Sequence, residues 1–287
     1  MKWASRAHGI RKMSGEISSL VKKWQEVLDS RGYENRIKHR KDFTHLTRLS
    51  RTWKYILQAS NLGPSASVFE FGCGGGNQLV PLAIRGYKCS GIDCSEEVLV
   101  RCKHFVSEVE TFIGKSLGIQ LICGDFLSFT SEDKYDLVFN FGVIEHFIDD
   151  HEREIAVQKM FTLCKPGGYV VSVVPSGKHP MRERMRKDGL GGYLIPEIDY
   201  DSELMTREMA KAGAEEVRVI PYNLFGHLMI KPSPPIIRLM RKVYYYMWQL
   251  LPPSFLPLRF ISRYAFGLIG IAQKPHRFED WRSMANP

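Results

Sequence analysis

VFEFGCGGG, residues 68–76, is the stretch of this 287-residue chain that decides its fold. An apolar run typical of a buried strand ends in three alternating glycines, Gly72, Gly74 and Gly76, and Glu70 stands two positions before the first of them. Glycine at every second position lets a strand turn sharply into a helix and exposes backbone N–H groups to a ligand that a Cβ would push away. The stretch predicts a nucleotide-type site, although a glycine-rich turn alone also occurs as a plain loop.

Four later segments also have the form of a strand with a polar residue at its end or a turn at its start. Because the carboxyl ends of parallel strands meet at one edge of a sheet, we expect these polar residues to converge. Helices are expected between them, near 77–85, 95–113 and 151–164. The segments are KCSGID (88–93), ending in Asp93; IQLICGDF (119–126), with Asp125; YDLVFNFGVIEHF (135–147), with Asn140, Glu145 and His146; and KPGGYVVSVVP (165–175), a turn and a fifth strand.

This order and spacing resemble the class I S-adenosylmethionine-dependent methyltransferases, well over residues 61–175 and loosely over 200–275. Oxidoreductase Rossmann folds are the alternative, but they space their glycines as GxGxxG, whereas this chain has GxGxG. The segments GVIEHF and KPGG resemble the small-molecule branch of the family. The resemblance implies S-adenosylmethionine as cofactor, its amino-acid part held by Glu70, Gly72, Cys73, Gly74 and Gly76, its ribose by Asp93 and its adenine beside Asp125 and Phe126, with Asn140 in the same site.

The resemblance also implies the architecture: a three-layer Rossmann-like α/β fold with a mostly parallel seven-stranded sheet. We expect a basic helical extension over residues 1–60, the methyltransferase domain over 61–275 and a tail over 276–287. The domain carries two expected lid segments. The first, 176–200, is irregular and rich in Gly, Pro, Arg and Met, and the second, 224–263, separates a strand near 215–222 from the closing strand at 267–274.

Composition allows one large catalytic domain. With 44% hydrophobic residues the chain can bury a full core, and its six cysteines include no CxxC pair. We therefore expect buried free thiols in a reducing compartment, and no metal site. Residues 1–20 lack the apolar region of a secretory signal, and no stretch reaches the roughly 18 apolar residues of a membrane span, which favours a cytoplasmic protein.

Charge is unevenly distributed. Residues 1–60 hold 14 Lys and Arg against 5 Asp and Glu, and residues 232–287 hold 8 against 2, whereas the segment between them is mildly acidic. Basic flanks favour an anionic partner, which could be a phospholipid surface, a nucleic acid or a phosphorylated substrate. The alternative is a set of solvated helix faces.

Amphipathic helices are expected in both flanks. Residues 15–29 and 43–59 each carry an apolar stripe at helical spacing. In 235–251 the apolar positions Ile236, Leu239, Met240, Val243, Tyr244, Met247, Leu250 and Leu251 recur at that spacing, opposite Arg238, Arg241, Lys242 and Gln249. Such a helix can lie at a membrane surface, or it can be a lid whose stripe packs against its own domain or a second subunit.

The resemblance directs the catalytic prediction to His146, with Glu145 before it. His146 is the first candidate for a base that takes a proton from the acceptor, and a role in holding the cofactor or the loop is the alternative. Three further residues, His179, Tyr193 and His227, lie on the expected lids. None of them has a partner that the sequence identifies.

The acceptor class is predicted mainly by elimination. The fourth strand ends in NFGV, not in the [DNS]PP[YFW] signature of nucleic-acid amino-methyltransferases, and neither a Pro-Cys nucleophile nor a paired-glutamate loop is present. We therefore expect methylation of a small molecule, at oxygen rather than nitrogen or carbon. A lipid-linked or membrane-surface acceptor is the first alternative, and RNA or protein is less favoured. A non-enzymatic role is disfavoured because Glu70, Asp93 and Asp125 are all present, and the sequence specifies no oligomeric state.

Overall fold

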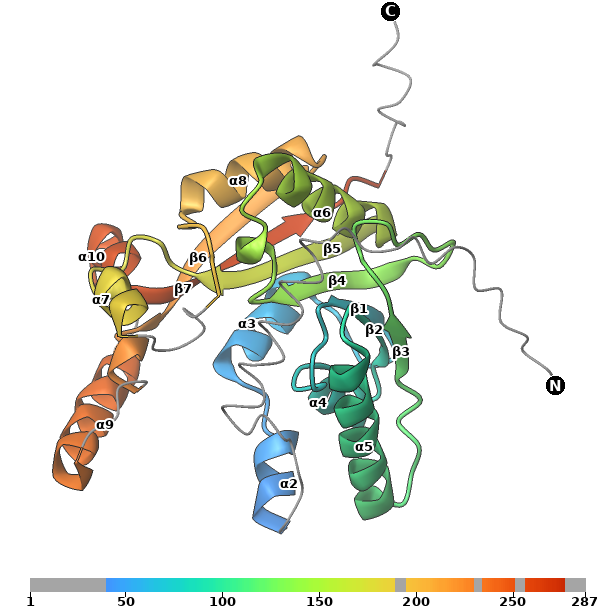
Figure 1. The fold of residues 1–287 in the computed structure, drawn as a ribbon, viewed down its shortest axis with the longest axis horizontal. Helices are drawn as coiled ribbons and strands as arrows, with labels where there is room; N and C mark the ends of the chain where they lie inside the picture. Colours follow the sequence, from blue (N-terminus) through green and yellow to red (C-terminus); the bar gives the residue numbers. More distant parts are fainter. Residues whose placement is uncertain (1–39, 189–194, 230–233, 251–255, 277–287) are drawn as a thin grey trace, which may run out of the picture.

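A seven-stranded sheet crosses the molecule in the order β3-β2-β1-β4-β5-β7-β6 (Figure 1). The computed structural model describes residues 40–188, 195–229, 234–250 and 256–276. Strand β7 pairs antiparallel with both β5 and β6, and the pairs among β1 to β5 are parallel, so the sheet is mixed but mostly parallel, as predicted. The strands are β1 Ser67–Phe71, β2 Lys88–Asp93, β3 Gln120–Cys123, β4 Tyr135–Phe141, β5 Cys164–Pro175, β6 Glu216–Leu224 and β7 Ala265–Gln273.

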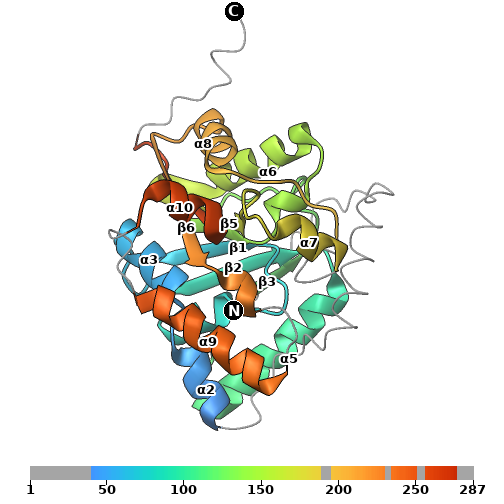
Figure 2. The ribbon, with the colours of Figure 1, turned by 90° about the vertical axis from the view of Figure 1, so that its left-hand side faces the viewer.

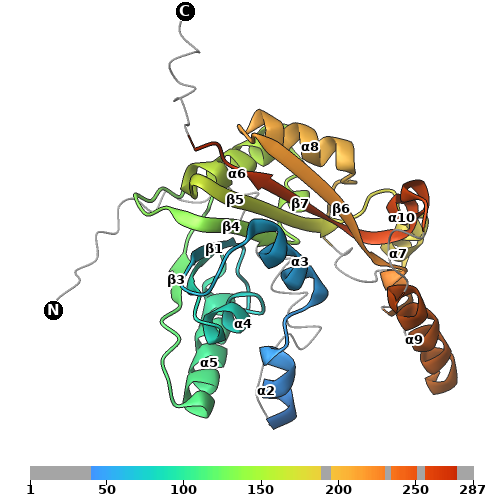
Figure 3. The same ribbon diagram turned by 180° about the vertical axis from the view of Figure 1, so that it is seen from behind.

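Helices cover both faces of the sheet, which gives the predicted three layers (Figures 1 and 3). One core lies between the sheet and α6 and α8, and its buried residues include Phe161 and Met205 of the helices and Phe69 and Phe71 of β1. The other lies on the opposite face under α3 and α4. The helices of these layers are α3 Arg51–Ser60, α4 Leu79–Ile84, α5 Glu96–Ile113, α6 Asp150–Leu163 and α8 Ser202–Lys211.

The helix predicted over 43–59 is wrong as a single element, because the chain forms two helices there. These are α2 Arg40–Thr47 and α3. Ser50 begins α3 with an extended backbone, and its hydroxyl accepts a hydrogen bond from the backbone N of Trp53 at 3.2 Å, which is the geometry of an N-cap. The helix predicted over 15–29 lies outside the described residues.

The KPGG segment also differs from the prediction. It was expected to be a turn before the fifth strand, but β5 already begins at Cys164, and its pairing with β4 is irregular near Tyr135. Gly167 adopts φ +76°, a backbone conformation that is strained for residues with a Cβ. The glycine therefore lets the chain bend inside the strand. The bend leaves the register from Tyr169 onward unaffected.

Both expected lid segments lie at the edge where β5 ends and β7 begins (Figure 2). The first contains the short helix α7 Arg182–Lys187. The second contains η2 Gly226–Met229, α9 Pro235–Leu250 and α10 Leu258–Tyr264, so the predicted interruption of the last hairpin is present. Among the described residues, no helix is both long enough and apolar enough to cross a membrane.

Helix α9 projects from the body (Figures 1 and 3), and the side chains of its apolar stripe are exposed. Leu239 is 63% exposed and Val243 62%. The opposite face makes the contacts: Tyr245 donates a hydrogen bond to Asn223 at 2.6 Å, and Trp248 packs against Phe225 with ring centroids 5.2 Å apart. The interpretation of α9 as a lid with its stripe packed on its own domain is therefore wrong.

Candidate active site

The glycine-rich loop lies where the strand order turns back, between β1 and β4, which is where open α/β sheets bind their ligands. The backbone N of Cys73 donates to the carbonyl of Ile92 at 3.0 Å, and that of Gly74 donates to Oδ2 of Asp93 at 2.9 Å. On the other side, a Cβ added to Gly72 would lie 2.6 Å from Val143. The loop is therefore held between the end of β2 and the segment that follows β4.

The three glycines of the loop differ in what a Cβ would contact at each position. All three have positive φ, but a Cβ at Gly72 or Gly76 would meet protein atoms, Val143 at 2.6 Å and the Cys102 sulfur at 2.8 Å. At Gly74, φ is +49° and no atom of the described residues lies within 4 Å of the added Cβ. Gly74 is thus the position of the loop that packing does not explain and that faces space open to a ligand.

Glu70 is a buried acid that lacks a partner. Its side chain is 2% exposed, and within the described part of the chain no hydrogen bond reaches Oε2. Burial, and then the negative charge of Asp93, raise the pKa of this carboxyl well above its usual range. A buried carboxyl in this state is suited to a ligand that brings a positive charge or a hydrogen-bond donor.

Asp93 and Asp125 both lie at the carboxyl edge of the sheet, as predicted. Asp93 accepts backbone hydrogen bonds from Gly74 and, at 3.0 Å, from Ser95, and these bonds partly offset the rise in its pKa that burial causes. Asp125 accepts one from Leu127 at 3.0 Å and is half-buried. The two acids thus order the turns in which they stand, and their contacts with a cofactor stay predictions.

The side chains of Cys73, Phe126 and Asn140 point into the cores. Asn140 is fully buried and donates to the Ser172 hydroxyl at 2.8 Å, and its Oδ1 receives no hydrogen bond from the described residues, so its contact with a cofactor stays a prediction. The ring of Phe126 packs edge-on against Phe71, and the Cys73 thiol is buried, with a raised pKa. At Cys73 and Phe126, therefore, only the main chain is available to a ligand at the edge.

Glu145 and His146 lie in the one-turn helix η1 Ile144–His146, directly beneath the first lid segment. The backbone N of Ile198 donates to the Glu145 carbonyl at 2.8 Å, and Nδ1 of His146 lies 2.9 Å from the carbonyl oxygen of Pro196. A carbonyl can only accept, so Nδ1 carries the proton of the neutral ring and Nε2 presents its lone pair. Burial lowers the pKa of His146, which favours this neutral form.

Two residues of the lid complete this part of the site, and sequence reasoning missed both. Glu197 places a carboxylate close to Glu145, and Nη2 of Arg182 lies 3.0 Å from Oε1 of Glu197. Burial raises the pKa of Glu145 to about 8, and the charge of Glu197 adds to that effect. Neither Glu197 nor Arg182 stands in a recognisable motif, and the fold of the lid alone brings them to η1.

The two lids meet at a pair of histidines. The rings of His179 and His227 have centroids 4.4 Å apart. Nδ1 of His179 accepts from the backbone N of Met181 at 3.1 Å, so the proton of the neutral ring is on Nε2. Burial, then His227 and Arg182, lower the pKa of His179 to about 4. Tyr193, the third residue predicted on the lids, lies outside the described residues.

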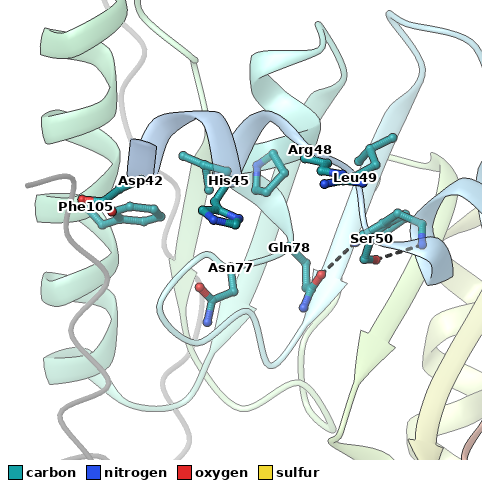
Figure 4. A pocket seen from close by; sticks show the side chains of 11 residues that line it. Asp42, His45, Arg48, Leu49, Ser50, Asn77, Gln78 and Phe105 are labelled. Atoms are coloured by element: carbon teal, nitrogen blue, oxygen red, sulfur yellow. Dashed lines mark hydrogen bonds between the residues drawn. The ribbon is translucent and has the colours of Figure 1, made fainter. Parts of the chain in front are cut away.

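A cavity of about 320 Å³ opens elsewhere, beside the residues that follow Gly76 (Figure 4). His45 of α2, together with Asn77 and Gln78, lines it, and Gln78 accepts a hydrogen bond from the Trp53 indole at 2.7 Å. None of the predicted catalytic or cofactor-binding residues contributes to its wall. The cavity is therefore distinct from the edge that carries the acids.

Comparisons with known proteins agree with this geometry. The family described as "Methyltransferase domain" matches residues 69–172. An uncharacterized methyltransferase of Bacillus mycoides is 26% identical over 159 residues, which are 55% of this chain and 67% of that protein. The sequence similarity thus covers the glycine-rich loop, all three acids and the segment with Glu145 and His146.

Solved structures share the fold at lower identity. Phosphoethanolamine N-methyltransferase 2 of Haemonchus contortus, in complex with S-adenosylmethionine, has a TM-score of 0.51 and 16% identity, with 77% of this chain and 52% of that chain covered. An S-adenosylmethionine-dependent methyltransferase of Thermotoga maritima has a TM-score of 0.52 and 16% identity, with 89% and 99% covered. These two likenesses concern the architecture of the whole domain.

Proposed function

We propose that this chain, an S-adenosylmethionine-dependent methyltransferase by its sequence similarity that shares the class I fold, methylates a hydroxyl group of a small molecule. The observation that carries the proposal is the buried pair Glu145 and His146 under a lid that bonds to both of them. The pair follows β4, the strand next to the glycine-rich loop, and a compact acceptor placed there could lose a proton to it.

The residues at the loop fit the cofactor. S-adenosylmethionine has a cationic amino group. This group could donate a hydrogen bond to Oε2 of Glu70, which receives none from the described residues, and Gly74 leaves room for its approach. Asp93 would bind the ribose hydroxyls. When bound, the cofactor supplies a methyl group on a positively charged sulfur, which a nucleophile displaces in line while the bonding electrons return to the sulfur.

The lid makes a small acceptor the best match. The backbone N of Gly177 donates to the carbonyl of Tyr200 at 2.6 Å, so both ends of the first lid segment are tied together. A Cβ at Gly177 would meet the backbone of Asp199 at 2.7 Å, which shows how closely the two ends approach. A folded RNA or protein surface would have to displace this segment to reach Glu145 and His146, which are buried, and this favours a small acceptor.

A hydroxyl acceptor, unlike a neutral amine, needs a base that removes its proton. Its oxygen is a weak nucleophile until the proton begins to leave, so a nearby proton acceptor accelerates the reaction. The carboxyl of Glu145 and Nε2 of His146 are the two groups that could serve an acceptor placed here. This favours oxygen over nitrogen or carbon as the methylated atom.

The test is to find the product. Metabolites and lipids extracted from cells with and without the active protein are compared by mass spectrometry for a pair of compounds that differ by one methylene group. We expect such a pair among small soluble compounds, with the new methyl resonance of the purified product at a chemical shift typical of O–CH₃. A Gly74→Val chain serves as the inactive control. A methyl group on nitrogen or carbon, or on RNA or protein, would refute the proposal.

A second candidate function is methylation of a lipid-like acceptor at a membrane surface, and the outward stripe of α9 favours it. Seven apolar side chains of this helix are more than 40% exposed along the predicted stripe: Ile236, Leu239, Met240, Val243, Tyr244, Met247 and Leu250. The helix contains no acid, and its cations Arg238, Arg241 and Lys242 match the charge of an anionic lipid surface. Such a surface is the occupant that we propose for the stripe.

Vesicle sedimentation separates the two candidates. For a membrane-surface acceptor we expect the protein to co-sediment with vesicles of phosphatidylserine and phosphatidylcholine, less with phosphatidylcholine alone, and to be released by salt, because each cation near the surface contributes about 1 kcal/mol. Replacing the three cations with glutamine should abolish sedimentation and leave cofactor affinity intact. Absence of sedimentation in low salt would eliminate the membrane candidate.

A further inference from the structure

Three side chains beneath the first lid have the composition and spacing of a cation site. Glu145, His146 and Glu197 each offer one oxygen or nitrogen atom, and these atoms lie within 4.8 Å of one another. All three side chains are at most 5% exposed. A cation with ligands at about 2.0 to 2.2 Å would draw the atoms together by about an ångström, which side-chain rotation can supply.

His146 already has the arrangement of a ligand that a neighbouring group orients. Its Nδ1–H donates to the carbonyl of Pro196, so Nε2 faces the two carboxyls with its lone pair. Nε2 lies 3.9 Å from Oε1 of Glu145. Metal-binding histidines commonly donate their second N–H to a backbone carbonyl in this way, which fixes both the tautomer and the direction of the ring.

One oxygen of each buried carboxyl is left without a hydrogen bond by the described residues. Oε2 of Glu145 and Oε1 of Glu197 receive no hydrogen bond within the described part of the chain. Arg182 approaches Oε1 of Glu197 to 3.0 Å as an ion pair without hydrogen-bond geometry, and its Nη2 donates to the carbonyl of Ile198 at 2.8 Å. Two buried carboxyls thus face one guanidinium, and a bound cation would favour the ionised form of both.

We propose that Glu145, His146 and Glu197 bind a divalent transition-metal ion. Two carboxylates and one imidazole suit Mn²⁺, Fe²⁺ or Zn²⁺ better than Mg²⁺ or Ca²⁺, which take oxygen ligands almost alone. The sequence predicted no metal site, because two of the ligands are adjacent and the third stands about fifty residues later in an irregular segment.

The ion would act on the acceptor. Three protein ligands leave coordination positions open, and a hydroxyl bound there loses its proton more readily, so its oxygen becomes a better nucleophile. This part of the inference rests on the proposed hydroxyl acceptor. Binding of the ion does not, and can be measured without any acceptor.

The experiment titrates Mn²⁺ into the full-length chain after treatment with EDTA and dialysis, and follows free Mn²⁺ by electron paramagnetic resonance. We expect one bound ion per chain, and at least about a tenfold weaker affinity in Glu145→Gln and in Glu197→Gln, which keep the shape of the side chain. Glu183→Gln is the matched control, because this acid on α7 is exposed and pairs only with Lys187 among the described residues. It should bind as the wild type does.

A second measurement guards against misfolded variants. Mn²⁺ should raise the melting temperature of the wild type and of Glu183→Gln, but not that of Glu197→Gln, since an ion that binds only the folded state stabilises it. Absence of Mn²⁺ and Zn²⁺ binding to the wild type at about 1 mM, or equal affinity in Glu197→Gln, would overturn the metal site.

The outcomes also separate this inference from the proposed function. A chain that binds no metal yet methylates a hydroxyl would refute the metal site. Glu145 and His146 would then act directly on the acceptor. A chain that binds Mn²⁺ but methylates nitrogen would support the metal site and refute the hydroxyl acceptor.

Discussion

The glycine-rich half of the site comprises residues 70–76 with Asp93 and Asp125, and the lid half comprises Glu145, His146 and residues 176–200. In the glycine-rich half, the described contacts are mostly between main chain and side chain, within one turn or between neighbouring strands. In the lid half, groups some fifty residues apart meet through hydrogen bonds to backbone carbonyls, and buried charged groups lie beside these bonds. The first half needs only the sheet to form, whereas the second also needs the lid to dock.

Substitutions in the two halves should therefore affect different quantities, cofactor affinity in one half and stability in the other. Residues of the glycine-rich half should affect cofactor affinity, since their own contacts are local. Residues of the lid half should affect the fold of the lid and its response to pH, because their charges are buried.

The largest effect is expected for Gly74→Val. The valine would fill space that no atom of the described residues occupies and that we assign to the cofactor, so cofactor affinity should fall by more than about 100-fold, which is roughly 2.7 kcal/mol. Calorimetric titration with S-adenosylhomocysteine measures it.

Gly114→Val is the matched control for backbone strain. Gly114 also has positive φ, +67°, and open space at its Cβ, but it is the C-cap of α5, at the end of this helix opposite to Asp93. This variant should lose stability and keep its affinity. Equal losses of affinity in both variants would show that strain, and not the cofactor, explains Gly74.

Asp93→Ala should weaken cofactor binding by about 2 to 3 kcal/mol, because charge-assisted hydrogen bonds to the ribose are lost together with the bond that holds Gly74. The same titration measures it. Asp201→Asn is a suitable comparison, since Asp201 likewise accepts a backbone N–H, from Leu204 at 2.9 Å, at the start of a helix. Unchanged affinity in Asp93→Ala would refute the assignment of this acid.

The lid half should lose stability in acid. The pKa of His179 is depressed to about 4 in the folded chain, whereas an unfolded histidine has a pKa of about 6.5. Between these values the unfolded chain takes up a proton that the folded chain excludes, so stability is complete above about pH 6.5 and declines as the pH falls toward 4. His227, whose pKa is also lowered, acts in the same direction.

Melting temperatures at pH 7.5 and pH 5 check this expectation. His179→Asn, which keeps an acceptor for the Met181 N–H, should reduce the difference between the two values. His104→Asn on the exposed side of α5 should leave it unchanged. An unchanged difference in His179→Asn would mean that other groups cause the acid sensitivity.

The smallest effect is expected on α9. Leu239→Asp with Val243→Asp should change the free energy of unfolding by less than about 0.5 kcal/mol per site, since both side chains are exposed. Trp248→Ala on the opposite face removes contacts with Phe225 and Phe260 and should cost more. A clear fall in melting temperature for the aspartates would restore the packed-lid interpretation.

The parts of the molecule that follow from local pattern could be predicted from the sequence. The strand runs, the helix behind Ser95 and the position of Asp93 depend on periodicity and on the edge at which parallel strands end. The break at Ser50 was missed because an N-cap serine inside an apolar periodicity does not interrupt the stripe.

The parts that depend on tertiary packing could not be predicted in the same way. Asn140 lies at a strand end but points into the core beneath α6, and alternation along a strand does not say which face binds a ligand. Glu197 and Arg182 reach η1 only through the path of an irregular lid. On α9, the face with Tyr245 and Trp248 packs against the body, whereas the more apolar stripe is exposed. Hydropathy alone would predict the opposite orientation of this helix.

The insertion between β6 and β7 begins and ends at the same rung of the sheet. Leu224 pairs with Ala265, and the backbone N of Phe225 donates to the carbonyl of Tyr264 at 3.0 Å. With the two ends fixed one strand spacing apart, the entropy of closing the loop grows by only about 0.6 kcal/mol for each doubling of its length. Segments of other lengths and compositions can therefore be grafted between Leu224 and Ala265 while the cofactor edge stays as it is, which makes this hairpin the place where a new acceptor specificity could be installed.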